Sequence, residues 1–579
     1  KEYLCCSLFW QLIICFMEQQ LSPKAQNSPL YSDDLAPISA TKRTWSVWNL
    51  AALWVGMAVC VPTYMLASSM IKSGLSWQAA LIIIGLANLV ITIPMVLNGE
   101  AGVRYGIPFP VIGRAAFGTS GIHIAAFLRA IVACGWFGIQ TWIGGLAIYS
   151  IFNALTGNVD APGLSIGEFV SFGIFWCINI YFIWKGTESI KWLEDYSAPI
   201  LLFIGLLLIA WGYREVGSAD VILSQSSQLG KNSVVLETSS VLRLETLKNA
   251  IGINKATQFQ LTAPSQSGSV QTFQWENLPP DGHIDLAPLL VRTDDPAKIK
   301  VQFRNAAQQT SSIVSASLQS QQSTQTWWTY LLWFTAMIGF WATMSISISD
   351  ITRFAKSQKD QVYGQLLGLP GTMMFYSFVG IFVTCAAVLA FQDVLIVEDA
   401  PWDPVSLVAK FNQPIIVVFA QIALLIATLS TNIAANVIAP AYAFSNLLPR
   451  QISFRMGGVI AGIIGIISCP WWLMKSISDI LLLISGLLGP ILGILLCDYF
   501  VVRRRQLALD ELYWVDGQYR YNNGWHLPAI VAMLVGVGVA IIGNFVPALS
   551  FLFTLSWFSG FISAFLVYWI LAKRPANAQ

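Results

Sequence analysis

Long apolar stretches recur along this chain at the length that crosses a lipid bilayer, and they limit its possible folds more than any other feature. A membrane-spanning helix needs about 20 mostly apolar residues. Of the 579 residues, 55% are hydrophobic and only 11% are charged, against roughly a quarter in soluble proteins. Twelve candidate spans follow one another, at 46–69, 77–97, 122–153, 164–185, 193–214, 327–350, 371–391, 414–439, 457–474, 477–501, 527–546 and 550–572. The sequence therefore predicts an all-α polytopic membrane protein whose main partner is the lipid bilayer.

Composition also excludes several classes of function. The net charge of +2 and the lack of a basic tract argue against nucleic-acid binding. The nine cysteines are scattered, with no CxxC pair, and are typical of small buried hydrophobic residues rather than of a disulfide frame or a metal site. No cluster of His, Asp or Cys marks a membrane-embedded enzyme. We expect neither an enzyme nor a protein with a bound cofactor.

Lysine and arginine gather in alternate connections between the spans. Arg353, Lys356 and Lys359 follow the sixth span, residues 503–505 follow the tenth, and the connection after the seventh span is acidic. Because cytoplasmic loops are enriched in Lys and Arg, this pattern predicts that both termini are cytoplasmic, in a cell or inner membrane.

The apolar run before Met17 is too short to span a bilayer. We therefore expect Met17 to be the true start and residues 1–16 to be upstream sequence, which an intact-mass measurement can test.

One long polar segment interrupts the spans and divides the chain. It is rich in Ser, Gln, Thr and Asn, and by the same count it lies on the outer face between the fifth and sixth spans. The pieces SVVLETSSVLRLETL and AKIKVQFRN have the composition of short strands, so the segment is either a small β-rich domain or a loose loop. The expected divisions are a tail at 1–45, a first transmembrane repeat at 46–214, the insertion at 215–326, a second repeat at 327–505, and a final loop, two spans and tail at 506–579.

Helix-breaking residues occur at matching places in the two repeats. The first span contains Pro62 in VGMAVCVPTYMLASS, and the sixth contains Gly339 in AMIGFWATMSISISD. A proline alone is more often a simple kink. Discontinuous helices at the same place in both halves are instead typical of transporters with inverted repeats, whose binding site lies near the membrane midplane.

Polar and aromatic side chains recur at helical spacing inside two other spans. Trp136 and Gln140 are four residues apart in the third span, as are Asn432 and Asn436 in the eighth, and Trp341 follows Gly339 closely. Carboxamides both donate and accept hydrogen bonds, as a small planar ring with alternating C=O and N–H groups requires. Each Asn or Gln taken singly is as compatible with helix–helix adhesion as with function. Their co-occurrence near the two breaks favours a substrate site.

A sodium ion is the expected coupling ion. The hydroxyls of Ser430 and Thr431 and the carbonyls freed by the break at 56–59 are hard oxygen ligands. A proton-driven carrier usually has a titratable group in mid-span, whereas the acidic residues here, such as Asp350 and Asp498, lie at span ends or in loops.

Several longer stretches resemble the nucleobase–cation symporter family, the hydantoin, allantoin, uracil and cytosine permeases. The resemblance covers nearly all of residues 33–575 outside the insertion, and is closest to the bacterial allantoin/uracil branch. It is carried by NGEAGVRYGIPFPVIGRAAFG, GWFGIQTWIGG, FWATMSISISDITRFAKSQKDQVYGQLLGLPG, STNIAANVIAPAY and GPILGILLCDYFVVRRR. It implies a LeuT-type fold of two inverted five-helix repeats plus two further helices, and a symporter that imports its substrate by alternating access.

The resemblance also implies roles for single residues. Trp136 and Trp341 would sandwich the ring, and Gln140, Asn432 and Asn436 would bind its edges. Sodium would be held by the carbonyls of Gly56, Val59 and Ala427 and by the hydroxyls of Ser430 and Thr431. Cys60 and Phe340 replace the Gln and Gly of the hydantoin-transporting member, which favours compact uracil or allantoin over a bulky hydantoin.

Some alternatives stay open at this point. A transporter-like receptor could use the outer insertion to read a ligand, protons could replace sodium, and an amino-acid carrier could share the fold. The residues do not decide which of uracil, allantoin, cytosine or hydantoin is carried. A monomer is the simplest expectation for the oligomeric state.

Overall fold

The computed structural model describes residues 21–572 with the exception of thirteen short segments. These are 158–163, 227–233, 239–240, 244–255, 265–269, 280–281, 288–297, 307–309, 311–313, 319–326, 392–402, 412 and 474–476. The predicted start at Met17 therefore lies outside the described residues.

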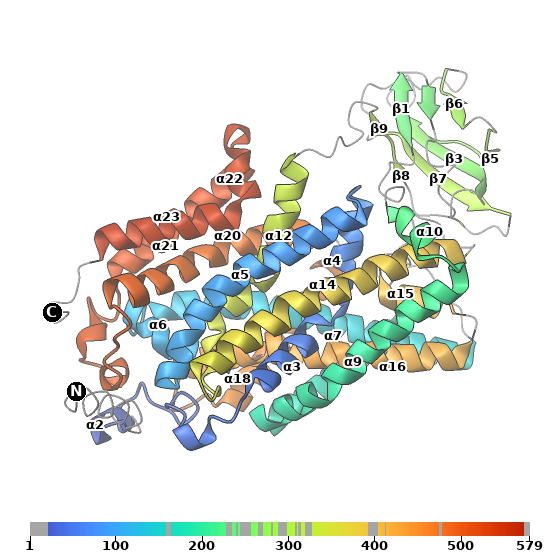
Figure 1. Cartoon of the computed structure of the whole chain (residues 1–579). Coiled ribbons are helices and arrows are strands. Elements are labelled where there is room, and N and C mark those ends of the chain that lie inside the picture. The colour runs from blue at the N-terminus through green and yellow to red at the C-terminus, as the bar shows by residue number, and fades with distance from the viewer. Residues whose placement is uncertain are drawn as a thin grey trace, which may run out of the picture.

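Helices occupy all twelve predicted spans and form one elongated bundle (Figure 1). Within the described part of the chain, nine helical spans are long and apolar enough to cross a membrane, and two further pairs of bent helices qualify if each pair is one span. The helix of the ninth span has only 14 residues. The main helices are α3 (Val47–Ala58), α4 (Val61–Lys72), α5 (Trp77–Tyr105), α7 (Ile122–Thr156), α8 (Ile166–Lys185), α9 (Thr187–Val216), α12 (Trp327–Ser347), α14 (Gln358–Ala390), α16 (Pro414–Asn436), α17 (Ile438–Leu447), α18 (Phe454–Ile467), α20 (Ile477–Leu496), α21 (Leu527–Ile541), α22 (Ser550–Thr554) and α23 (Ser556–Leu571).

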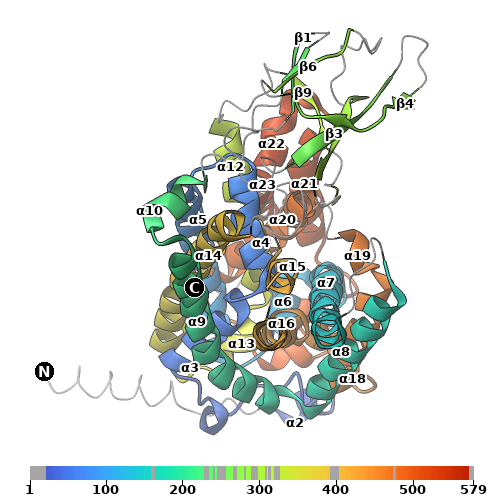
Figure 2. The same cartoon turned by 90° about the vertical axis from the view of Figure 1, so that its right-hand side faces the viewer.

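The helices pack as two groups that meet along the middle of the bundle. In the first group α14 contacts α3, α4 and α5, and α12 contacts α5. In the second group α7 contacts α8, α16 and α18. The groups meet where α16 contacts α3, and α9 covers the same junction (Figure 2). Each group takes helices from both halves of the chain, as two intertwined repeats require.

Three details differ from the sequence predictions. The break expected at Gly339 is wrong, because α12 runs continuously from Trp327 to Ser347. Gly339 instead allows close packing on α20, since a Cβ there would lie 2.7 Å from the carbonyl oxygen of Leu481. The seventh span was predicted to start at 371, yet α14 starts at Gln358, where the Ser357 hydroxyl accepts a hydrogen bond from the Asp360 amide. The twelfth span is bent by 86° near Leu555.

The insertion contains two small β-sheets, so its β-rich interpretation is confirmed. One sheet has the order β6 (His283–Asp285), β2 (Val241–Arg243), β1 (Val235–Thr238) and β9 (Ser317–Leu318). The other has the order β4 (Val270–Thr272), β3 (Ala256–Pro264), β7 (Lys300–Asn305) and β8 (Val314–Ser315), and β5 (Glu276–Asn277) also pairs with β3. Apolar side chains such as Leu236, Leu242, Phe259 and Phe303 form their common core.

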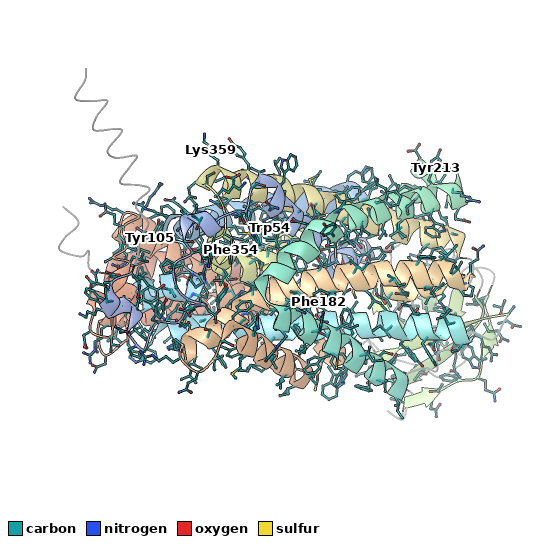
Figure 3. All side chains as sticks on the ribbon, turned by 90° about the horizontal axis from the view of Figure 1, so that it is seen from below. Trp54, Tyr105, Phe182, Tyr213, Phe354 and Lys359 are labelled. Carbon is teal, nitrogen blue, oxygen red and sulfur yellow. The ribbon has the colours of Figure 1, made fainter. Side chains whose placement is uncertain are left out.

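The insertion lies at one end of the bundle, and the first and last described helices reach the other end. The sheets stand beyond one end, whereas the short helix α2 (Pro23–Gln26) and the last turns of α23 lie at the other (Figure 1). Seen from below, Tyr105 and Phe354 lie toward the α2 end, Tyr213 lies at the opposite end, and Trp54 lies between them (Figure 3). The α2 end is called the inner end below.

Candidate functional site

The first span is interrupted at the middle of the bundle. Helices α3 and α4 meet at an angle of 59°, and Val59 and Cys60 form the link between them. Pro62 lies in the first turn of α4, where a missing N–H costs no helical hydrogen bond. The predicted discontinuity in this span is therefore confirmed, and Pro62 begins the second half-helix rather than merely kinking a continuous one.

The break turns backbone carbonyls toward the eighth span. The Thr431 hydroxyl donates to the carbonyl oxygen of Gly56 at 3.0 Å and lies 3.3 Å from that of Met57. Carbonyls in the last turn of a helix lack intrahelical partners, so they are free to accept from a side chain or to bind a cation. Thr431 therefore links α16 to α3 across the junction between the two helix groups.

The other residues predicted to bind sodium lie along the same junction. Val59 and Ala427 are both buried, belong to one apolar cluster and line the same cavity. The Ser430 hydroxyl lies 3.1 Å from that of Ser197 on α9. The five predicted ligands thus lie at the interface between the helix 1 break and α16, and Ser197 adds an oxygen that the sequence did not single out.

A chain of aromatic rings lines the interior beside the break. Phe340 contacts Trp136 with ring centroids 5.6 Å apart and Trp341 with centroids 4.9 Å apart, both edge to face. Trp341 in turn makes an edge contact with Trp54, at 5.2 Å. Phe340 therefore contacts both indoles that were expected to enclose a ring.

The carboxamides of α16 are held by neighbouring helices. The Asn432 amide lies 3.0 Å from Asn179 Oδ1 on α8 and 3.1 Å from Thr141 Oγ1 on α7, and its oxygen accepts from the Asn436 amide at 3.1 Å. These bonds fix α16 against α7 and α8. Asn432 thus helps to hold the neighbouring helices together, and it also orients Asn436.

Gln140 differs from the asparagines. Its side chain is only 2% exposed, and among the described residues its Oε1 atom has no hydrogen-bond partner. The Cys60 thiol interacts with the side chains of both Gln140 and Thr431, which places the predicted ring-binding and ion-binding residues next to each other. Within the same described part of the chain, Trp341 Nε1 is also a buried donor without a partner. An unsatisfied buried polar group is costly, so each is a candidate to bind a ligand.

Two charged residues near this site were not selected from the sequence. Arg129 lies inside α7, two turns before Trp136, and is 1% exposed. Asp350, which was treated as a span-end residue, is also 1% exposed and lies in the short helix α13 (Ser349–Thr352). Arg129 was detectable, because an ionisable residue inside a predicted span is by default a functional candidate.

The fold and this site define a membrane transporter with its polar residues at the junction of two helix groups. The profile of a family of permeases for cytosine and purines, uracil, thiamine and allantoin matches residues 37–244 and 302–560. This chain belongs to that family, and the predicted resemblance is confirmed.

Individual relatives agree along nearly the whole chain. An allantoin permease of Bacillus subtilis (strain 168) is 32% identical over 559 residues, covering 95% of this chain and 94% of the relative. A purine-uracil permease of Arabidopsis thaliana is 32% identical over 584 residues, covering 97% and 80%.

Solved structures confirm the fold. MHP1, a nucleobase-cation-symport-1 family transporter in a closed conformation with bromovinylhydantoin bound, matches with a TM-score of 0.65 and 23% identity, covering 93% of this chain and 94% of that structure. A Na⁺-coupled sialic acid symporter matches with a TM-score of 0.54 and 13% identity, covering 92% and 91%. The chain therefore has the LeuT-type fold of two inverted five-helix repeats with two additional helices.

Proposed function

We propose that this protein is a symporter that imports a compact planar ring compound, uracil or allantoin foremost, by alternating access and with a sodium ion. The observation that carries the proposal is the shared position of the helix 1 break, Gln140 and Thr431. Cys60 lies in that break, is fully buried, and interacts with both side chains. Binding of ring and ion at adjoining points would couple them directly, since each would stabilise the same arrangement of the two helix groups.

Within this proposal, hydrogen bonding explains the choice of substrate class. Gln140 Oε1 is a buried acceptor and Trp341 Nε1 a buried donor, and neither has a partner in the described residues. A ring with neighbouring N–H and C=O groups could satisfy both. Phe340 contacts both indoles, which leaves little width and favours a compact ring over a substituted one.

Sodium would be held where Thr431 now bridges to α3. Its hydroxyl already lies 3.0 Å from the Gly56 carbonyl, so both oxygens could bind one cation after a small shift. Ser430, Val59 and Ala427 would complete the set of oxygen ligands. A cation held by both α3 and α16 would tie together the helix groups that alternating access moves apart.

The relatives support the choice of ring. The chain is 32% identical both to an allantoin permease and to a purine-uracil permease. We also propose that the inner end of the bundle faces the cytoplasm, since the Lys- and Arg-rich connections, such as that at 353–359, lie toward that end.

Reconstituted vesicles test the proposal. We expect labelled uracil or allantoin to accumulate in proteoliposomes under an inward sodium gradient and to leak out when the gradient is collapsed. Accumulation driven by a pH gradient without sodium would contradict sodium coupling. Binding without accumulation would contradict transport and support a receptor.

Competition by unlabelled cytosine, hydantoins and purines then ranks the substrates. Gln140→Leu, which removes the unpartnered acceptor while keeping the side-chain volume similar, should abolish most uptake. Thr92→Val is a matched control, because it removes a buried hydroxyl that bonds to Asn88 of its own helix. Uptake at the normal rate in Gln140→Leu would contradict the site.

A further inference from the structure

Arg129 lies on the inner side of the candidate site. It lies seven residues before Trp136 on α7, about two helical turns toward the inner end. Its Nε donates to the Ser347 hydroxyl at 3.1 Å, and one terminal nitrogen donates to the carbonyl oxygen of Ala435 at 3.2 Å. Ser347 ends α12, and Ala435 precedes Asn436 on α16. One guanidinium thus joins the three helices that supply the aromatic and carboxamide residues of the site.

Asp350 faces Arg129 from the adjoining turn. One carboxylate oxygen accepts from the Phe109 amide at 2.7 Å, at the start of helix α6 (Phe109–Phe117). The other carboxylate oxygen, like Arg129 Nη1, is buried and has no hydrogen-bond partner in the described residues. Both residues line one gap, which has no room for a water molecule.

Leaving a guanidinium N–H and a carboxylate oxygen unsatisfied on the walls of one gap is costly inside a membrane protein. The arrangement becomes understandable if the gap opens during the transport cycle. Arg129 would then release Ser347 and Ala435, and the two charged groups would present one donor and one acceptor to whatever enters. A planar ring with an adjacent C=O and N–H matches that pair.

We propose that Arg129 and Asp350 form a second, inner binding subsite for the transported ring, which the hydrogen bonds of Arg129 to Ser347 and Ala435 hold shut in this structure. The ring would accept from Arg129 and donate to Asp350 as it leaves Gln140 and Trp136 for the cytoplasm. The identity of this ligand rests on the proposed function. The closing of the gap by Arg129 does not.

A double variant tests the subsite without leaving a buried charge. Single neutralisation would strand the other charge and could destabilise the protein, whereas Arg129→Gln with Asp350→Asn removes both charges. We expect the double variant to bind labelled uracil or allantoin at equilibrium within about threefold of the wild type, and to exchange it across the vesicle membrane about tenfold more slowly, the effect of one lost hydrogen bond to a charged group. Exchange at the wild-type rate would overturn the proposal, as would parallel loss of binding and exchange.

Cysteine labelling tests the closed gap without any substrate. Ala439 is buried and lines the gap. An impermeant maleimide applied from the inner side should label Ala439→Cys slowly, and at least about fivefold faster when Arg129→Gln with Asp350→Asn removes the bonds that keep the gap shut. Equal labelling in both backgrounds would show that Arg129 does not close the path. If neither uracil nor allantoin binds, cysteine labelling still reports whether Arg129 keeps the gap shut. Failure of the proposed substrate can therefore be distinguished from failure of the proposed closure.

Discussion

Replacing Thr431 with Val tests the ion site most sharply, because it removes one hydroxyl while keeping the side-chain shape. The hydroxyl contacts the carbonyl oxygens of Gly56 and Met57, at 3.0 and 3.3 Å, and would become one of about five oxygen ligands of sodium. A hydrogen bond or ligand contact to a charged group contributes about 1.5–3 kcal/mol. We therefore expect the sodium affinity to fall by about 10- to 100-fold.

Thermal unfolding measures that affinity without knowledge of the substrate. A ligand that binds only the folded protein raises its stability by RT ln(1 + [L]/Kd), so sodium should raise the melting temperature of the wild type relative to potassium or choline. Thr431→Val should need about 10- to 100-fold more sodium for the same rise. Thr431→Ser, which retains the hydroxyl, and Thr92→Val should respond like the wild type. An unchanged sodium response in Thr431→Val would refute the assignment of this residue.

Three other outcomes follow from the structure. Trp136→Ala and Asn432→Ala should each reduce uptake to near zero, since one removes an aromatic wall and the other costs roughly 1–3 kcal/mol in lost hydrogen bonds; normal rates in vesicles would contradict the site. Deletion of residues 220–325 should leave uptake unchanged, because the sheets have their own core; lost uptake with intact folding would give the insertion a role in transport. Burial lowers the pKa of His526 below its ordinary value of 6.5, so protonation favours the unfolded chain, and stability is lost as the pH falls below about 6.5. Acidification should therefore lower the melting temperature of the wild type more than that of His526→Asn.

The sequence predicted the membrane architecture well because hydrophobic length is set by the bilayer itself. It also predicted the break in the first span, since Pro62 cannot continue a helix from the preceding turn without losing a hydrogen bond. The same reasoning failed at Gly339. A glycine in an apolar helix serves either a break or a close helix contact, and only the neighbouring residues Leu481 and Ser485 show that here it serves contact.

Helix length was less predictable than membrane span. Helix α14 begins at Gln358 with a polar first turn, and hydropathy detects only the part of a helix that lies in lipid. Helix α14 is therefore longer than its apolar stretch suggests.

The site was predictable as a set of residue types but not as a network. Asn432 stood out by its spacing from Asn436, yet its partner Asn179 lies in another span with no signal of its own. Arg129 is buried next to carbonyl and hydroxyl oxygens that only tertiary packing brings to it. Spacing along one helix cannot reveal partners that come from two others.

An experimental structure with sodium and the best competing ring compound would test the central claim most directly. We expect density for the ring beside Trp136, Phe340 and Trp341, hydrogen-bonded to Gln140, and density for an ion between Thr431 and the Gly56 carbonyl. A ring bound elsewhere, with those side chains still packed on one another, would contradict the claim that this junction is the transport site.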